Sequence, residues 1–136
     1  MRANLLAISA CVVALVLSGC SSVGQQALSA AQEAEAALAS GSLAWQQHEH
    51  NRTLPTVTIT TLRDMLAAIS GAESTLTELP AGGSRSASRA LSAVREADDA
   101  VARALAAVTA GGSATGITAQ LQAATDDLDL AIRGLR

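Results

Sequence analysis

Apolar residues recur at three- and four-residue steps along four stretches of this chain, and short turns rich in glycine and proline separate the stretches. The stretches run from Gln25 to about residue 50, from Pro55 to Leu79, from about residue 85 to 110, and from Ile117 to the end. A turn of three to five residues cannot carry the chain back to the far end of a helix, so consecutive helices must lie antiparallel. The pattern therefore predicts an all-α, up-down-up-down antiparallel four-helix bundle.

One position inside the first stretch could interrupt the predicted helix. Gly41 and Ser42 are poor helix formers. Trp45, however, follows Leu38 by seven residues and returns to the same helical face. We therefore expect this helix to continue to about residue 50.

The start of the second stretch has the alternating pattern of a strand, in the sequence TVTIT at residues 56–60. A single strand with no partner elsewhere is not a stable unit. Proline is favoured in the first turn of a helix, so Pro55 predicts a helix start, although Thr61 and Asp64 offer a later one.

The third and fourth stretches have the clearest apolar faces. The expected core positions are Ala87, Leu91, Val94, Ala97, Val101, Ala104, Leu105 and Val108 in the third, and Ile117, Leu121, Ala124, Leu128, Ile132 and Leu135 in the fourth. On the polar sides, Asp99 with Arg103 and Asp129 with Arg133 have the spacing of helical ion pairs. Alanine at many contact positions predicts modest stability, because each alanine buries little apolar area.

Composition excludes several classes of function. The chain has no lysine, which excludes a Schiff-base lysine, a phosphate-loop lysine and the Ser-x-x-Lys acyl-enzyme arrangement. Trp45 is the only aromatic residue, so surfaces that stack sugars or bases are not expected. Without residues 1–19 the chain carries eight scattered arginines against twelve acidic residues, a net charge of -4, which argues against a nucleic-acid partner.

The first twenty residues carry the most specific motif. Arg2 precedes an uncharged apolar run from Leu5 to Leu17, a pattern typical of a signal peptide. Leu17-Ser18-Gly19-Cys20 then resembles the lipobox of bacterial lipoproteins: an aliphatic residue, two small residues and a cysteine. We interpret residues 1–19 as signal peptide, 20–24 as lipidated tether and 25–136 as the helical domain. The alternative is an uncleaved apolar anchor that ends in cysteine by chance.

The resemblance implies a defined chemistry at the lipobox. A diacylglyceryl group joins the Cys20 thiol as a thioether, a signal peptidase cuts between Gly19 and Cys20, and the new amine accepts a fatty acyl chain. Two or three acyl chains hold a protein stably on a bilayer. The expected location is the cell membrane, lipid-anchored and facing outside the cytoplasm; Ser21 in place of aspartate is compatible with the outer membrane, if the organism has one. Cys11 leaves with the leader, so the domain must fold without a disulfide.

Few residues beyond Cys20 are candidates for a site. His48 and His50 are the only histidines, and residues two apart in a helix diverge by about 200 degrees, so they could share a metal only in an extended segment. Asp126, Asp127 and Asp129 lack the spacing of a calcium loop. The adjacent carboxylates Glu33 with Glu35, and Asp98 with Asp99, are expected to be surface charge.

These observations predict a non-enzymatic envelope lipoprotein without a cofactor, whose bundle is a scaffold or docking surface for another envelope component. The alternative is a small ligand- or metal-binding bundle, with Trp45 and the segment from His48 to His50 as its site. A murein-bound structural lipoprotein is not supported, because that family ends in a lysine and this chain ends in Arg136. The sequence does not specify an oligomeric state.

Overall fold

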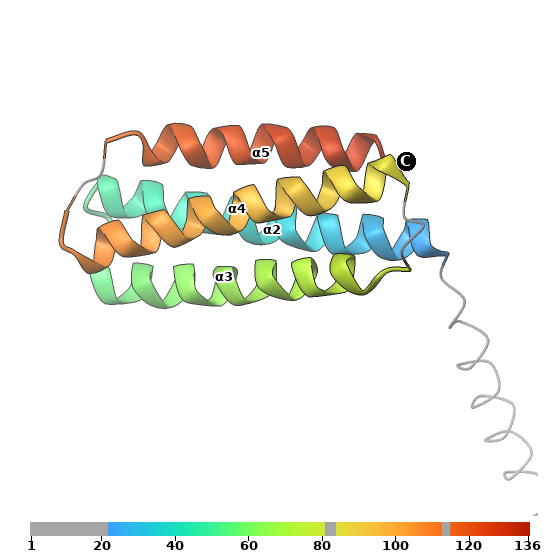
Figure 1. Ribbon diagram of the computed structural model, residues 1–136. Coiled ribbons are helices and arrows are strands. Elements are labelled where there is room, and N and C mark those ends of the chain that lie inside the picture. The colour runs from blue at the N-terminus through green and yellow to red at the C-terminus, as the bar shows by residue number, and fades with distance from the viewer. Residues whose placement is uncertain (1–21, 81–83, 113–114) are drawn as a thin grey trace, which may run out of the picture.

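A computed structural model describes residues 22–80, 84–112 and 115–136, and it confirms the four-helix bundle (Figure 1). The helices are α2 (Val23–Glu49), α3 (Pro55–Glu78), α4 (Arg85–Thr109) and α5 (Ile117–Arg133). No strand occurs in the described residues. Consecutive helices pack against one another and run in opposite directions, as the short turns require.

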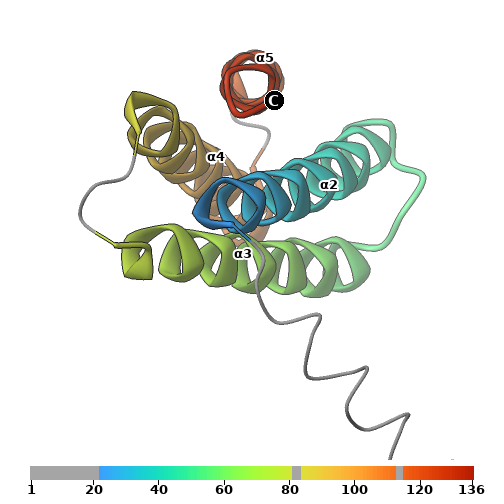
Figure 2. The same cartoon turned by 90° about the vertical axis from the view of Figure 1, so that its right-hand side faces the viewer.

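The four helices do not meet equally. α2 packs against α3, α5 and also α4, whereas α3 and α5 share no packing contact (Figure 2). α2 and α4 therefore form the short diagonal of the bundle. Both helices place mainly alanine on the core side: Ala27, Ala30, Ala31, Ala34 and Ala37 in α2, and Ala90, Ala93, Ala97, Ala100 and Ala104 in α4. Small side chains allow the two backbones to approach closely.

α2 begins earlier than the apolar pattern predicts. Ser22 caps the helix, and its hydroxyl accepts a hydrogen bond from the Gln25 backbone N–H at 3.3 Å. Serine is among the best N-cap residues because it satisfies a backbone donor that the first turn leaves free. Val23 and Gly24, which the sequence assigned to the tether, are therefore helical.

The interior of α2 settles the ambiguity at Gly41. The helix continues without a break to Glu49, close to the predicted end. Gly41 itself is buried, and a Cβ added there would lie 3.6 Å from Val101 Cγ2 and 3.7 Å from Leu62 Cδ2. The helix ends where Asn51 takes a positive φ of 53°, a conformation that asparagine tolerates better than most residues.

α3 starts at Pro55, as the sequence predicts, and the strand-like stretch after it is helical. In this helix the threonine hydroxyls donate to backbone carbonyls one turn earlier: Thr60 to Thr56 at 3.0 Å and Thr61 to Val57 at 3.0 Å. Thr58, the only buried polar residue among those described, bonds to Thr53 Oγ1 at 3.0 Å. These bonds satisfy the polar atoms of β-branched residues that would otherwise favour a sheet.

The predicted apolar face of α4 is confirmed in part, because Val94, Ala97, Val101, Ala104 and Val108 are buried. Ala87, Leu91 and Leu105 are only partly buried, whereas Ala90, Ala93 and Ala100 are buried. The prediction weighted the larger side chains, whereas the buried face of α4 consists of alanine and valine. In α5 the predicted residues are confirmed as core, except that Leu135 is partly buried.

Two salt bridges occur within the described residues. Arg133 pairs with Asp129 as predicted, and Arg95 of α4 binds Glu73 of α3 with Nε and Oε1 2.7 Å apart. The predicted pair of Asp99 and Arg103 is wrong, because the two form no salt bridge. Both side chains are exposed, and an isolated exposed pair contributes only a few tenths of a kcal/mol.

The antiparallel order sorts the helix ends into two groups. The start of α2, the end of α3, the start of α4 and the C-terminus lie at one end of the bundle, which we call the tether end (Figure 1). The end of α2, the start of α3, the end of α4 and the start of α5 lie at the opposite, far end. Within the described residues, none of the helices combines the length and apolar character needed to cross a membrane.

Gly41→Ala should stabilise the bundle. The added methyl would meet its neighbours at ordinary contact distances, and alanine is favoured over glycine in a helix interior by about 0.5 to 1 kcal/mol. Thermal and urea unfolding followed by circular dichroism would measure the gain. Gly41→Leu is the matched control, and we expect it to destabilise the protein because the same space cannot hold a larger side chain. A loss of stability in Gly41→Ala would contradict the packing described for α2.

Candidate functional site

The predicted lipidation site lies just ahead of the bundle. Cys20 and Gly19 fall outside the described residues, so their roles stay predictions. The nearest described residue, Ser22, is the N-cap of α2 and follows Cys20 by two positions. Two extended residues span at most about 7 Å, so the first turn of α2 is close to the lipid-bearing position.

The candidate metal ligands are in a helical geometry. His48 is in the last turn of α2 and His50 is its C-cap. The His48 ring lies against the indole of Trp45, with centroids 6.0 Å apart, and His50 Nδ1 lies 2.7 Å from the Gln46 carbonyl oxygen. The two imidazoles therefore do not have the extended geometry that sharing an ion requires. Among the residues described, no group of three or more His, Cys, Asp or Glu side chains is arranged to hold a metal ion.

Trp45 belongs to the core rather than to an open pocket. Its side chain has no exposed surface, and its Nε1–H donates to Thr118 Oγ1 at 3.0 Å. The Thr118 hydroxyl in turn donates to Glu49 Oε2 at 2.9 Å. Gly116, with a φ of 94° that favours glycine, caps α5 and brings Thr118 into this position. The chain of hydrogen bonds ties the end of α2 to the start of α5.

The acidic residues of α5 contact separate partners. Asp126 accepts a hydrogen bond from Gln122 Nε2 at 3.0 Å, and Asp129 pairs with Arg133. Asp127 faces Glu96 of α4. Partial desolvation raises the pKa of Glu96 above that of an ordinary glutamic acid, and hydrogen bonding to Asp127 and its negative charge raise the pKa further. The three aspartates do not converge on one cation position.

The paired carboxylates predicted as surface charge lie apart from any enclosed cavity. Asp98 accepts a hydrogen bond from Ser70 of α3 at 3.0 Å, whereas Asp99 lines a shallow 190 Å³ hollow beside α5. Glu33 is exposed and Glu35 is partly buried on α2. An acid and a base for catalysis need environments that separate their pKa values, and neither pair has an apolar wall of that kind.

A groove of about 760 Å³ lies at the tether end between the start of α2 and the end of α3. Its lining mixes polar and apolar side chains, with Gln25, Gln26, Leu28, Gln32 and Glu33 from α2 and Thr75, Glu78 and Leu79 from α3. None of these side chains is a cysteine, histidine or lysine. We find in it no combination of a nucleophile with a base.

A second surface, at the far end, has a different character. Leu43 of α2 and Val57 of α3 are 55% and 53% exposed, and neighbouring Leu54 is 68% exposed. A hollow of about 240 Å³ lies between the first two and is lined otherwise by hydroxyl, amide and alanine side chains: Ser40, Ala44, Gln47, Thr53, Thr58 and Thr61. We call this the Leu43–Val57 surface.

A pattern in the sequence indicates this surface, although the spacing of apolar residues does not reveal it. Residues 36–47 and 54–62 contain no charged residue, although both segments belong to helices with exposed faces. A solvent-exposed helix face is usually charged. Two uncharged runs that become neighbours across the α2–α3 turn therefore indicate a shared uncharged surface.

Comparison with protein-family models, with curated proteins and with solved structures found no match to this chain.

Replacing Thr118 by Val should destabilise the bundle by about 1 to 3 kcal/mol, because the buried indole N–H of Trp45 loses its acceptor. Trp45 is the only tryptophan, so its fluorescence reports unfolding at this position. In a Trp45→Phe background, followed by circular dichroism, the same threonine replacement should cost much less. Equal costs in the two backgrounds would show that the hydrogen bond does not fix α5 to α2.

Proposed function

We propose that this chain is the precursor of a bacterial envelope lipoprotein. Lipid on Cys20 anchors it to the cell membrane, and the bundle faces outside the cytoplasm. The bundle is non-enzymatic and serves as a scaffold or docking surface for another envelope protein. The anchor rests on the lipobox at residues 17–20, and Ser21 after it is compatible with an outer-membrane location where that membrane exists.

The observation that carries the proposal is the direct connection between the lipobox and the bundle. α2 begins at Val23, three residues after Cys20, and Ser22 caps it. A flexible linker would leave the domain free to tumble, whereas this connection keeps the tether end beside the bilayer. Leu43 lies twenty residues further along α2, which at 1.5 Å per residue is about 30 Å from the tether end.

The Leu43–Val57 surface is therefore presented away from the membrane. Exposed aliphatic side chains surrounded by uncharged polar ones resemble the centre and rim of a protein interface. The grouping of Leu43, Leu54 and Val57 also differs from scattered surface leucines, which need no explanation. This surface supports recognition of a partner protein with a complementary apolar face.

The alternative, a bundle that binds a small ligand or a metal, has weaker support. Trp45 is buried in the core, and His48 and His50 diverge. The hollow at the Leu43–Val57 surface, about 240 Å³, is smaller than the roughly 300 to 1,000 Å³ of most ligand pockets. The groove of about 760 Å³ is large enough, but it lies at the tether end, away from Trp45, His48 and His50. A flat protein partner fits the dimensions better.

Photo-crosslinking in intact cells tests the docking role. A photoreactive amino acid in place of Leu43 or Val57 should yield a discrete cross-linked species, whose second component mass spectrometry identifies. Ala119, exposed on α5 at the same end, is the control position and should not yield it. The same adducts at Ala119, or none at Leu43 and Val57, would contradict a docking role for this surface.

A further inference from the structure

We infer that the tether end of the bundle, where α4 begins and α5 ends, binds anionic phospholipid headgroups of the membrane that carries the anchor. The inference rests on the proposed lipid anchor at Cys20 and adds a second membrane contact, made by arginine side chains.

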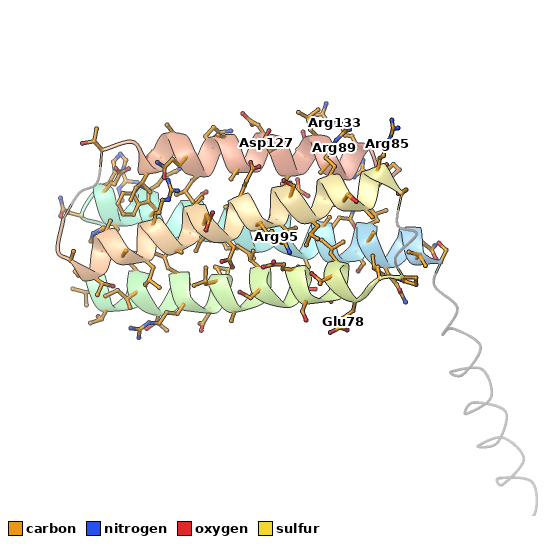
Figure 3. The ribbon with its side chains drawn as sticks, viewed as in Figure 1. Glu78, Arg85, Arg89, Arg95, Asp127 and Arg133 are labelled. Carbon is orange, nitrogen blue, oxygen red and sulfur yellow. The ribbon has the colours of Figure 1, made fainter. Side chains whose placement is uncertain are left out.

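Three arginines gather at this end. Arg85 and Arg89 lie in the first two turns of α4, and Arg133 is in the last turn of α5; Figure 3 shows all three at this end of the bundle. Positions 85 and 89 are one turn apart and share a helix face. Arg136 follows three residues after the end of α5 and lies at the same end of the bundle.

The carboxylates at this end do not neutralise the group. Asp129 pairs with Arg133, and this hydrogen bond, together with the charges of Arg133 and Arg136, lowers the pKa of Asp129. Within the described residues, Arg85 and Arg89 form no salt bridge. Glu78 lies at the same end on α3, which packs against α4, but it forms no salt bridge with Arg85 or Arg89 (Figure 3). Two guanidinium groups are thus available to an external anion.

The charge reverses further along the side of the bundle that α4 and α5 form. About two turns beyond Arg89, Glu96 and Asp99 of α4 lie with Asp127 of α5 around the 190 Å³ hollow, where Arg103 is the only basic residue. The chain as a whole is acidic, with a net charge of -3. A basic end and an acidic middle make the bundle electrically polar along its axis, and a negatively charged membrane would attract the basic end and repel the middle.

The position relative to the anchor identifies the anion. The arginines are at the end where α2 begins, and Ser22 at the start of α2 is two residues from Cys20. Guanidinium groups bind phosphate oxygens in a bidentate geometry, and lipid phosphates would be the anions nearest to them. An acyl anchor combined with a basic surface is an established way to hold a protein on an anionic bilayer.

A fluorescent label at the arginine pair tests the inference with the full lipidated protein. Cys20 is the only thiol left once the leader is removed, so Ser88→Cys provides a single free thiol, on an exposed position beside Arg89. The protein is reconstituted in phosphatidylcholine vesicles with or without phosphatidylglycerol, and a quencher is attached to the lipid headgroups. We expect stronger quenching with phosphatidylglycerol, and a loss of the difference at high salt.

The double variant Arg85→Gln/Arg89→Gln should lower the ratio of docked to undocked protein by roughly fivefold per arginine. Arg52→Gln/Arg63→Gln removes the same charge from exposed positions in the other half of the bundle, and it should leave quenching unchanged. Equal quenching in both vesicle types, or equal effects of the two double variants, would overturn the inference. Inorganic phosphate at constant ionic strength should not abolish the effect of phosphatidylglycerol on quenching. If it did, the arginines would form a general anion site, and the inference would be overturned.

The same preparation separates this inference from the proposed anchor. Sedimentation of the vesicles shows whether the protein stays with the lipid at all. If the protein stays bound but the headgroups do not quench the label, the proposed anchor stands and the arginine contact is rejected. If the protein sediments with neither vesicle type, the anchor proposal is rejected, and the inference that rests on it is rejected too.

Discussion

The close approach of α2 and α4 is the constraint on which the rest of the bundle depends. Alanine makes up most of the buried face of both helices, so the backbones can form a short diagonal across the core. Such contacts bury little apolar area per residue. The larger side chains fill the space beside that diagonal: Trp45, Leu38, Leu62, Ile69, Leu121, Leu128 and Ile132 are all fully buried. A single larger residue on the alanine faces would separate the helices and open these layers.

This geometry also separates two surfaces by the length of the molecule. Because consecutive helices alternate in direction, the start of α2 and the C-terminus share one end, and the α2–α3 turn lies at the other. The arginines of α4 and α5 gather at the first end, and the uncharged Leu43–Val57 surface lies toward the second. A bundle anchored at its first end would thus contact lipid with one surface and present the other to a partner. At the far end, the hydrogen bond from Trp45 to Thr118 holds the start of α5 against the end of α2.

Apolar periodicity predicted the helices, because core leucines, isoleucines and valines stand at helical spacing and Gly and Pro mark the turns. It predicted only some of the alanines that face the core, since alanine occurs readily in both environments: in α4 it identified Ala97 and Ala104 but missed Ala90, Ala93 and Ala100. Contacts such as Arg95 with Glu73, or Glu96 with Asp127, depend on how two helices are rotated relative to each other. The residue pattern of a single helix carries no information about that rotation. The burial of Trp45 agrees with its predicted place on the face of Leu38, whereas its hydrogen bond to Thr118 could not be predicted, for the same reason. Cys20 lies outside the described residues, and its role stays a prediction from the lipobox.

The central claim is that lipid on Cys20 holds this bundle at a membrane, and metabolic labelling tests it most directly. Cells that express the full chain are fed a labelled fatty acid, and the protein is isolated and fractionated. We predict that the label enters the protein, that it fractionates with membranes, and that Cys20→Ala loses the label and accumulates as the uncut precursor. Unlabelled wild-type protein, together with unchanged processing and membrane fractionation of Cys20→Ala, would contradict the account.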